Sequence, residues 1–245
     1  QRRHQKVIEE SPAPNLNAAL RQRICAAAVA AARAVNYSNA GTIEFLVEGG
    51  TGATDNFYFL EMNTRIQVEH PVTEIVHGVD LVKLQLLVAQ GLPLPYEQEQ
   101  IITRGHAIEF RVSAEDPRNN FSPTTGKLRY LHIPSGPGVR EDGWVEAGTQ
   151  ISPYYDSLLT KLTVSGSNRT EALAAARFAL HEMVVEGVPT TLGFHRWMLE
   201  QPDFQNGDLD VKWIERNYQG QVQEQSCVGP FILPPLRNAA AEGER

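Results

Sequence analysis

Chemically capable side chains gather in residues 60–74, which read LEMNTRIQVEHPVTE. Acidic, amide and basic groups alternate there with apolar residues, a composition that fits neither a core strand nor a surface helix. On a strand, Glu61 and Asn63 would project from one face, and Glu44 on a neighbouring strand could face them. Three such oxygen donors suit Mg²⁺, which takes few protein ligands and completes its shell with water and phosphate oxygens. The alternative is that both carboxylates face solvent on an edge strand.

The residues that follow suit a small anion. Arg65 offers a planar fork for a carboxylate-like or phosphate group, and Gln67 with nearby backbone amides could complete a pocket. A carboxylate beside an anion site is electrostatically unfavourable, which makes Glu69 a candidate general base. The alternative is an exposed Arg65–Glu69 ion pair, worth less than about 1 kcal/mol. His70, directly before Pro71, is more typical of a structural histidine than of a ligand.

Arg111 stands in the middle of an apolar strand pattern, AIEFRVSAED at 107–116. A buried guanidinium costs free energy unless it is paired or functional. The sequence leaves two interpretations equally open: an ion pair with Glu109 or Glu115, or a functional role.

The elements that would position these residues follow from periodicity and turn residues. Asn17 is a candidate N-cap for an Ala-rich helix to about residue 35, whose apolar positions share one face. Strands at 41–48 and 57–63 are joined through a Gly-rich turn as a hairpin. A short helical turn should begin at Pro71, followed by a helix at 79–90. Residues 92–100 are the candidate domain boundary.

Beyond this boundary the pattern predicts three strands, at 106–114, 127–133 and 158–165. Two helices should follow, at 170–185 with Thr170 as its cap and at 192–199. Antiparallel strands followed by helices predict an α+β fold.

Composition narrows the function. The 245 residues carry a net charge of −7, which disfavours a dedicated nucleic-acid binder. No run reaches the roughly 18 apolar residues of a membrane span, so no membrane partner is expected. Cys25 and Cys227 lie far apart and in no metal-binding spacing, which indicates a reducing, cytoplasmic setting.

Six motifs then occur in a characteristic order: QRRHQK at 1–6, GTIEF at 41–45, FYFLEMNTRIQVEHPVTE at 57–74, GVDLVKLQ at 78–85, RGHAIEFRVSAEDP at 104–117 and PYYDSLLTKL at 153–162. Over residues 1–218 this set resembles the C-terminal half of biotin carboxylase, the ATP-grasp component of acetyl-CoA carboxylase and related biotin-dependent carboxylases. The resemblance implies the C-terminal part of an ATP-grasp domain at 1–96 and a biotin carboxylase C-terminal domain at 103–218. We expect the polar tail at 219–245 to be disordered.

The resemblance also implies which residues hold the nucleotide. Glu44 and Glu61, with Asn63, would ligate the Mg²⁺ or Mn²⁺ ions on the ATP phosphates. Gln1 and His4 would line the nucleotide pocket together with those carboxylates.

For the other substrates, the resemblance implies that four groups hold bicarbonate: Lys6, Arg65, Gln67 and the backbone of Val68. Glu69 would take the bicarbonate proton. Arg111 would stabilise the enolate oxygen of biotin, which gives an arginine a reason to sit in an apolar strand. The implied activity is ATP-dependent carboxylation of carrier-bound biotin through carboxyphosphate.

The implied partners are a biotin carboxyl carrier protein or domain, a carboxyltransferase and a second copy in a homodimer. We expect a piece of a longer polypeptide, because the N-terminal half of the family pattern is missing, and hence little activity from this chain alone. Acetyl-CoA, as in fatty acid biosynthesis, propionyl-CoA, methylcrotonyl-CoA, pyruvate and urea remain open as final acceptors. Two alternatives also remain: another ATP-grasp ligase, such as a carbamoyl-phosphate-type enzyme, and a non-catalytic assembly or dimerisation module.

Overall fold

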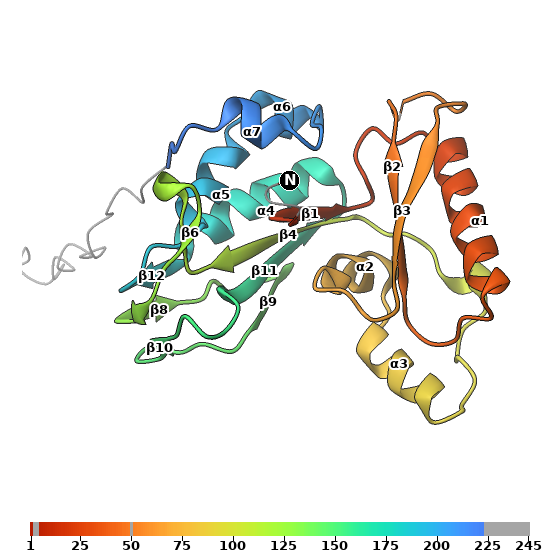
Figure 1. Ribbon diagram of the computed structural model, residues 1–245, viewed down its shortest axis with the longest axis horizontal. Helices are drawn as coiled ribbons and strands as arrows, with labels where there is room; N and C mark the ends of the chain where they lie inside the picture. The colour runs from red at the N-terminus through yellow and green to blue at the C-terminus, as the bar shows by residue number, and fades with distance from the viewer. Residues whose placement is uncertain (2–4, 50, 223–245) are drawn as a thin grey trace, which may run out of the picture.

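The computed structural model describes residues 1, 5–49 and 51–222, so His4, Cys227 and most of the predicted tail lie outside the described residues. Every strand pairing among them is antiparallel. Figure 1 shows a sheet backed by helices on one side of the molecule, and a β-hairpin with a long helix on the other. This arrangement confirms the predicted α+β class.

The larger sheet has the strand order β1-β4-β11-β9. Its strands are β1 (Ile8–Ser11), β4 (His106–Ser113), β11 (Leu158–Gly166) and β9 (Val139–Gly143). On one face, Ile108 and Phe110 of β4 are fully buried and pack against helices α4 (Arg169–Glu182) and α5 (Leu192–Leu199). Because strand residues alternate in direction, Glu109 and Arg111 are directed to the other face.

Strand β1 joins this sheet from the far end of the sequence. Ile8 lies opposite Phe110, and Glu9 lies opposite Glu109. Glu10 faces the other way, where His106 and Arg169 bind its carboxylate. The sheet therefore combines residues from before and after the predicted boundary at 92–100, and the division after residue 96 remains a proposal.

The hairpin consists of β2 (Thr42–Val47) and β3 (Phe57–Asn63), as predicted, with a bulge that leaves Leu60 without a partner in the register. Helix α1 (Ala18–Ala34) runs beside it, and its N-cap is the predicted Asn17, whose side chain accepts from the amide of Ala19. The predicted apolar face of this helix is only partly right, since Leu20 is its one buried residue and Val35 is 64% exposed.

Helices α2 (His70–His77) and α3 (Leu81–Ala89) follow the hairpin. The turn predicted at Pro71 is thus a two-turn helix, and it packs its apolar residues Val72 and Val76 against Ala107 of β4. In the described residues, no helix is long and apolar enough to span a membrane.

The C-terminal elements differ from prediction in several places: the strand expected at 127–133 is divided between β7 (Gly126–Lys127) and β8 (Tyr130–His132), and β9 was not predicted. Asn168, and not Thr170, caps α4, since its side chain accepts from the amide of Glu171. The helix also ends at Glu182, and β12 (Val184–Glu186) then pairs with β8. The remaining short elements are β5 (Glu115–Asp116), β6 (Ser122–Pro123), β10 (Gln150–Ile151), α6 (Pro202–Asn206), α7 (Trp213–Asn217) and two 3₁₀ turns (Gln98–Gln100 and Pro117–Asn119).

Candidate active site

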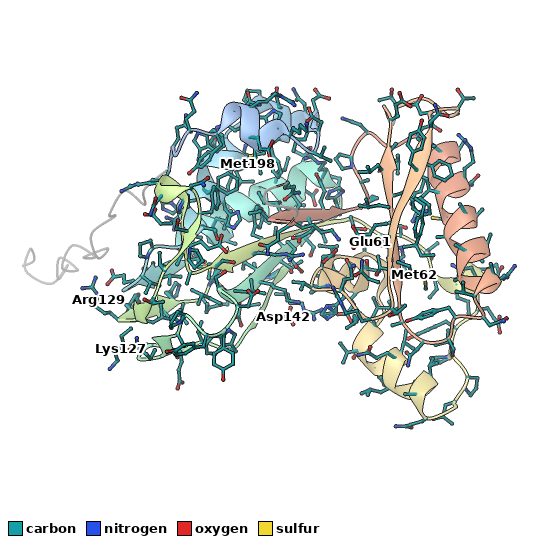
Figure 2. The ribbon with its side chains drawn as sticks, viewed as in Figure 1. Glu61, Met62, Lys127, Arg129, Asp142 and Met198 are labelled. Atoms are coloured by element: carbon teal, nitrogen blue, oxygen red, sulfur yellow. The ribbon has the colours of Figure 1, made fainter. Side chains whose placement is uncertain are left out.

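The hairpin brings the three predicted oxygen donors together. Glu44 lies directly opposite Glu61 in the register of β2 and β3. The Asn63 amide nitrogen donates to Glu61 Oε1 at 2.7 Å and to Glu44 Oε1 at 3.3 Å. In Figure 2, Glu61 lies on the side of the hairpin that faces the four-stranded sheet, whereas its neighbour Met62 lies on the other side. The two carboxylates therefore point into the space between the two halves of the molecule.

Lys6 connects the hairpin to the loop that follows it. Its Nζ donates to Glu44 Oε1 at 2.7 Å, to Gln67 Oε1 at 2.9 Å and to Glu69 Oε1. Gln67 also donates to Glu44 Oε1 at 2.9 Å. Burial disfavours the charged forms of both Lys6 and Glu44. Their hydrogen bonds and mutual attraction outweigh burial, so the pKa of Lys6 is raised and the pKa of Glu44 is lowered.

Arg111 holds the second oxygen of Glu69. Its Nη2 donates to Glu69 Oε2 at 2.9 Å, and its Nε donates to Glu9 Oε1 at 2.6 Å. The sequence suggested Glu109 or Glu115 as the ion-pair partner of Arg111, but the partners observed are Glu9 and Glu69. Burial raises the pKa of Glu9 to about 7, although the charge of Arg111 opposes that shift. Glu69 is thus oriented by a cation on each side.

Arg65 does not take part in the contacts of Glu69 with Lys6 and Arg111. Its side chain is exposed, donates to the backbone oxygen of Ile66 at 3.0 Å and lies 3.5 Å from Asn63 Oδ1. Glu69 pairs with Lys6 and Arg111, so the simple Arg65–Glu69 ion pair is not the arrangement observed. The guanidinium remains accessible beside the carboxylates of the hairpin.

The backbone at Val68 is fixed from the sheet. Lys161 of β11 donates from Nζ to the Val68 carbonyl oxygen at 2.9 Å, and this lysine is only 9% exposed. A buried ammonium directed at one carbonyl restrains the peptide planes that surround Val68. The loop between β3 and α2 is therefore held by the hairpin through Lys6 and by the sheet through Lys161.

On the other side of β1, Gln1 lines a hollow of about 570 Å³. Its amide is bound to the backbone of β1, donating to the Ile8 oxygen at 2.6 Å and accepting from the Ile8 amide at 2.9 Å. Most of the hollow is apolar, with walls from the hairpin and from the C-terminal helices: Leu46, Val47, Met198, Phe204, Leu209 and Trp213. Such a hollow suits a flat heterocycle. His4, the other predicted nucleotide contact, lies outside the described residues.

Glu9 and Lys161 belong to this site and were missed in the sequence. The signal was available, because each stands at a polar position among alternating apolar residues of a strand, as Arg111 does. The C-terminal wall of the hollow gave no comparable signal, since its residues resemble any helical core pattern.

The donor set of the hairpin would fit a divalent cation that takes its other ligands from elsewhere. The described residues contain no group of three or more His, Cys, Asp or Glu side chains that could hold an ion alone. Two facing carboxylates and an amide suit Mg²⁺ or Mn²⁺ whose remaining ligands come from a nucleotide. Asn63 would have to turn its amide oxygen toward the carboxylates, a rotation that leaves the side chain in place.

Comparisons with known proteins cover both parts of the chain. Residues 1–97 match the family model of the carbamoyl-phosphate synthase L chain ATP-binding domain, and residues 109–216 match that of the biotin carboxylase C-terminal domain. The chain is 49% identical to the biotin carboxylase of Nostoc sp. over 88% of its own length and 47% of that protein. It is 46% identical to the biotin carboxylase of Haemophilus influenzae, over 88% of this chain and 47% of that protein.

A solved structure is similarly close. The biotin carboxylase domain dimer of Hydrogenobacter thermophilus 2-oxoglutarate carboxylase, in complex with MgADP, ADP and bicarbonate, is 39% identical, with a TM-score of 0.86. The match covers 91% of this chain and 49% of that one. The chain thus spans about half the length of the relatives that it matches. With both of its parts matched in order, the chain belongs to the biotin carboxylase family and corresponds to the C-terminal part of its relatives.

Proposed function

We propose that this chain provides the metal, bicarbonate and biotin side of a biotin carboxylase active site. The reaction would be ATP-dependent carboxylation of carrier-bound biotin with bicarbonate through carboxyphosphate, the first half-reaction of an acyl-CoA carboxylase. The observation that carries the proposal is the position of Glu69 between Lys6 and Arg111, which joins the hairpin and the sheet in one polar cluster. The remaining nucleotide contacts would come from residues that correspond to the other half of the relatives.

Glu44, Glu61 and Asn63 would hold Mg²⁺ or Mn²⁺ on the ATP phosphates. The metal would neutralise phosphate charge during phosphoryl transfer. Lys6 binds Glu44 of the metal site, so its ammonium would lie between the metal site and the bound bicarbonate and stabilise negative charge on both. The hollow beside Gln1 would receive the base of the nucleotide.

Bicarbonate would bind to Lys6, Arg65, Gln67 and the Val68 backbone, largely by positioning. The exposed guanidinium of Arg65 offers a bidentate contact to such an anion. Glu69 would accept the bicarbonate proton, since its two oxygens are held by separate donors and its direction is fixed. Arg111 would release part of its contact with Glu69 to bind the developing enolate oxygen of biotin.

The proposed partners are a biotin carboxyl carrier protein or domain, a carboxyltransferase and a second copy of the chain. The relative from Hydrogenobacter thermophilus is a dimer in its solved structure, which supports the last of these. Two of the solved relatives come from a 2-oxoglutarate carboxylase and from a pyruvate carboxylase, so this site does not choose the final acceptor.

The test is to combine this chain, fused or in trans, with the complementary N-terminal part of the Nostoc relative. We expect ATP hydrolysis that depends on bicarbonate and rises with free biotin, while the chain alone is inactive. Glu69→Gln should reduce this turnover at least about a hundredfold, in line with the loss of a general base. Glu48→Gln is the matched control, because Glu48 lies at the far end of the same hairpin, where its carboxylate accepts from Asn56 and Tyr58.

Two results would contradict the proposal. Hydrolysis that ignores biotin and survives Arg111→Ala would favour another ATP-grasp ligase, such as the carbamoyl-phosphate type that the first family model describes. A stable complex with no hydrolysis at all would favour a non-catalytic assembly module.

A further inference from the structure

Two acidic residues face each other beneath Arg111. Glu9 of β1 and Glu109 of β4 are directly opposite in the register, on the polar face of the four-stranded sheet. Glu109 is 0% exposed and the Glu9 side chain is 8% exposed. Directly opposed side chains in such a pair have Cβ atoms about 5 Å apart. Two like charges at this separation and depth repel each other strongly and are poorly solvated.

Each of these carboxyl groups has one oxygen that is bound and one that is not. Glu9 Oε1 accepts from Arg111 Nε at 2.6 Å, and Glu109 Oε2 accepts from the Thr163 hydroxyl at 3.3 Å. Glu9 Oε2 and Glu109 Oε1 are buried and have no hydrogen-bond partner among the described residues. Buried acceptors without donors are rare and costly, so two on facing residues require a common explanation. A single proton between them would satisfy both.

We propose that Glu109 is a positioning residue: it carries a proton, donates it in a hydrogen bond to Glu9, and thereby keeps Glu9 as the anion that orients Arg111. The proton belongs on Glu109 because Glu9 is the residue in direct contact with a guanidinium, which favours its charged form. Glu109 has only a hydroxyl as its bound partner. This assignment does not depend on catalysis; only its consequence for turnover rests on the proposed function.

The other charges near Glu109 do not replace this proton. Lys161 lies opposite Arg111 on the neighbouring strand β11, and its Nζ is bound to the Val68 carbonyl oxygen. On α2, which packs against the same face, Glu74 is bound to Arg140 and His70 lies 3.9 Å from Glu74. Burial and, after it, the charge of Glu9 raise the pKa of Glu109 to about 8, although Lys161 and Arg111 oppose the shift.

The stability of the chain against pH tests the proton directly. The folded-state pKa of Glu109 lies above its unfolded value of 4.5, so the folded state binds the additional proton. Its stabilising contribution is complete below pH 4.5 and is lost as the pH rises through about 8. Glu109→Gln keeps the shape and a donor but cannot ionise. The ratio of its folding equilibrium constant to that of the parent should rise by up to about tenfold per pH unit across this window.

Glu10→Gln is the matched control with the opposite sign. Glu10 lies next to Glu9 on β1 but faces His106 and Arg169, whose hydrogen bonds outweigh burial and lower its pKa. Its contribution is present above the unfolded pKa of 4.5 and is lost at lower pH. Above pH 5.5 the ratio for Glu10→Gln should stay below one and lack the tenfold rise per pH unit expected for Glu109→Gln.

Infrared spectroscopy of the parent chain provides a second readout that needs no foldable variant. A protonated carboxyl stretch should be present at pH 7 and disappear as the pH passes about 8. Absence of that band at pH 7, or a flat stability ratio for Glu109→Gln, would overturn the proposal.

In the complemented enzyme described above, Glu109→Gln should keep turnover at neutral pH and lose the alkaline fall in rate. Glu109→Leu, which removes the donor, should reduce turnover at every pH. If no variant, the parent included, shows turnover that depends on biotin, the proposed function fails while the stability and infrared readouts still decide on Glu109.

Discussion

Strands β4 and β3 both carry aromatic and aliphatic side chains but have opposite surroundings. In β4 all residues except Arg111 are buried, and Phe110 has no exposed surface. In β3 the aromatic and aliphatic side chains Tyr58, Phe59 and Leu60 are 56%, 60% and 51% exposed. The described residues leave these three side chains largely uncovered, and the Phe59 ring makes its aromatic contact with Phe45 on the partner strand.

The contrast shows that the apolar core and the candidate active site draw on different parts of the molecule. The sheet and its helices form the largest apolar core, and the hairpin adds little to it. The candidate active site lies where the hairpin and the four-stranded sheet meet. There Lys6 binds a carboxylate of the hairpin, and the loop after β3 binds two cationic side chains of the sheet. A rigid support on one side and accessible donors on the other are consistent with the proposed function.

The sharpest way to break the comparison is to truncate one phenylalanine on each side. Phe110→Ala should destabilise the chain by about 3–5 kcal/mol, because it leaves a cavity in the core. Phe59→Ala should cost under about 1 kcal/mol, because its ring is largely in water already. Urea unfolding followed by tryptophan fluorescence measures both. Equal losses would mean that the hairpin is stabilised by contacts beyond those of the described residues.

Acid should weaken the sheet through His195. This residue is 0% exposed, its Nε2 lies 2.8 Å from the Arg111 carbonyl oxygen, and burial lowers its pKa to about 4. The folded state therefore binds fewer protons than the unfolded one, and the stability present above pH 6.5 is lost as the pH falls toward 4. We expect a loss of about 3 kcal/mol over this range. His195→Gln should flatten the slope, and exposed His132→Gln should not change it.

Two arginines of the site should differ in their effect on stability. Arg111→Ala leaves Glu9 and Glu69 without their shared partner, so we expect a loss of about 2 kcal/mol. Arg65→Ala removes an exposed group and should cost less than about 0.5 kcal/mol. In the complemented enzyme both should reduce turnover. If Arg111→Ala and Arg65→Ala destabilised the chain equally, the sheet and the exposed edge of the hairpin would not differ in the way described.

A smaller effect than that of Arg111→Ala is expected at the contact between the sheet and the loop after β3. Lys161→Met keeps the aliphatic stem but loses the hydrogen bond to Val68, at a cost of about 1 kcal/mol. Amide hydrogen exchange should become faster in residues 64–70 and stay unchanged in β4. Faster exchange in both would show that the lysine supports the whole sheet, and unchanged exchange in both would show that it supports neither.

Local signals predicted the hairpin and α1 well. Asn17 caps the helix, and the turn residues and β-branched pattern define both strands, because caps and turns are encoded within a few residues. Neighbouring caps are harder to rank, since Asn168 and Thr170 can both accept from helix amides. Strand β9 was missed because its sequence, VREDG, carries charges at positions that only the sheet context makes tolerable.

The partners inside the site were not predictable in the same way. Glu9 binds Arg111 across 102 residues of sequence, and Lys161 binds Val68 across 93. Nothing local encodes which distant strand will be the neighbour, whereas Glu109 and Glu115 were attractive only because they are near in sequence. The sequence thus provided most of the candidate site residues, whose roles stay predictions, and the structure was needed to connect them.

Strand β1 has a consequence for how the protein is made. Ribosomes add about 5–20 residues per second, so Phe110 follows its partner Ile8 from the ribosome by roughly 5–20 s. During this interval Glu9 and Glu10 lack the strand that directs one to Arg111 and the other to His106. The nascent chain can form α1 and the hairpin in the meantime, because those need only nearby residues. The cluster of charged side chains around Glu69 can therefore form only after β4 has emerged from the ribosome.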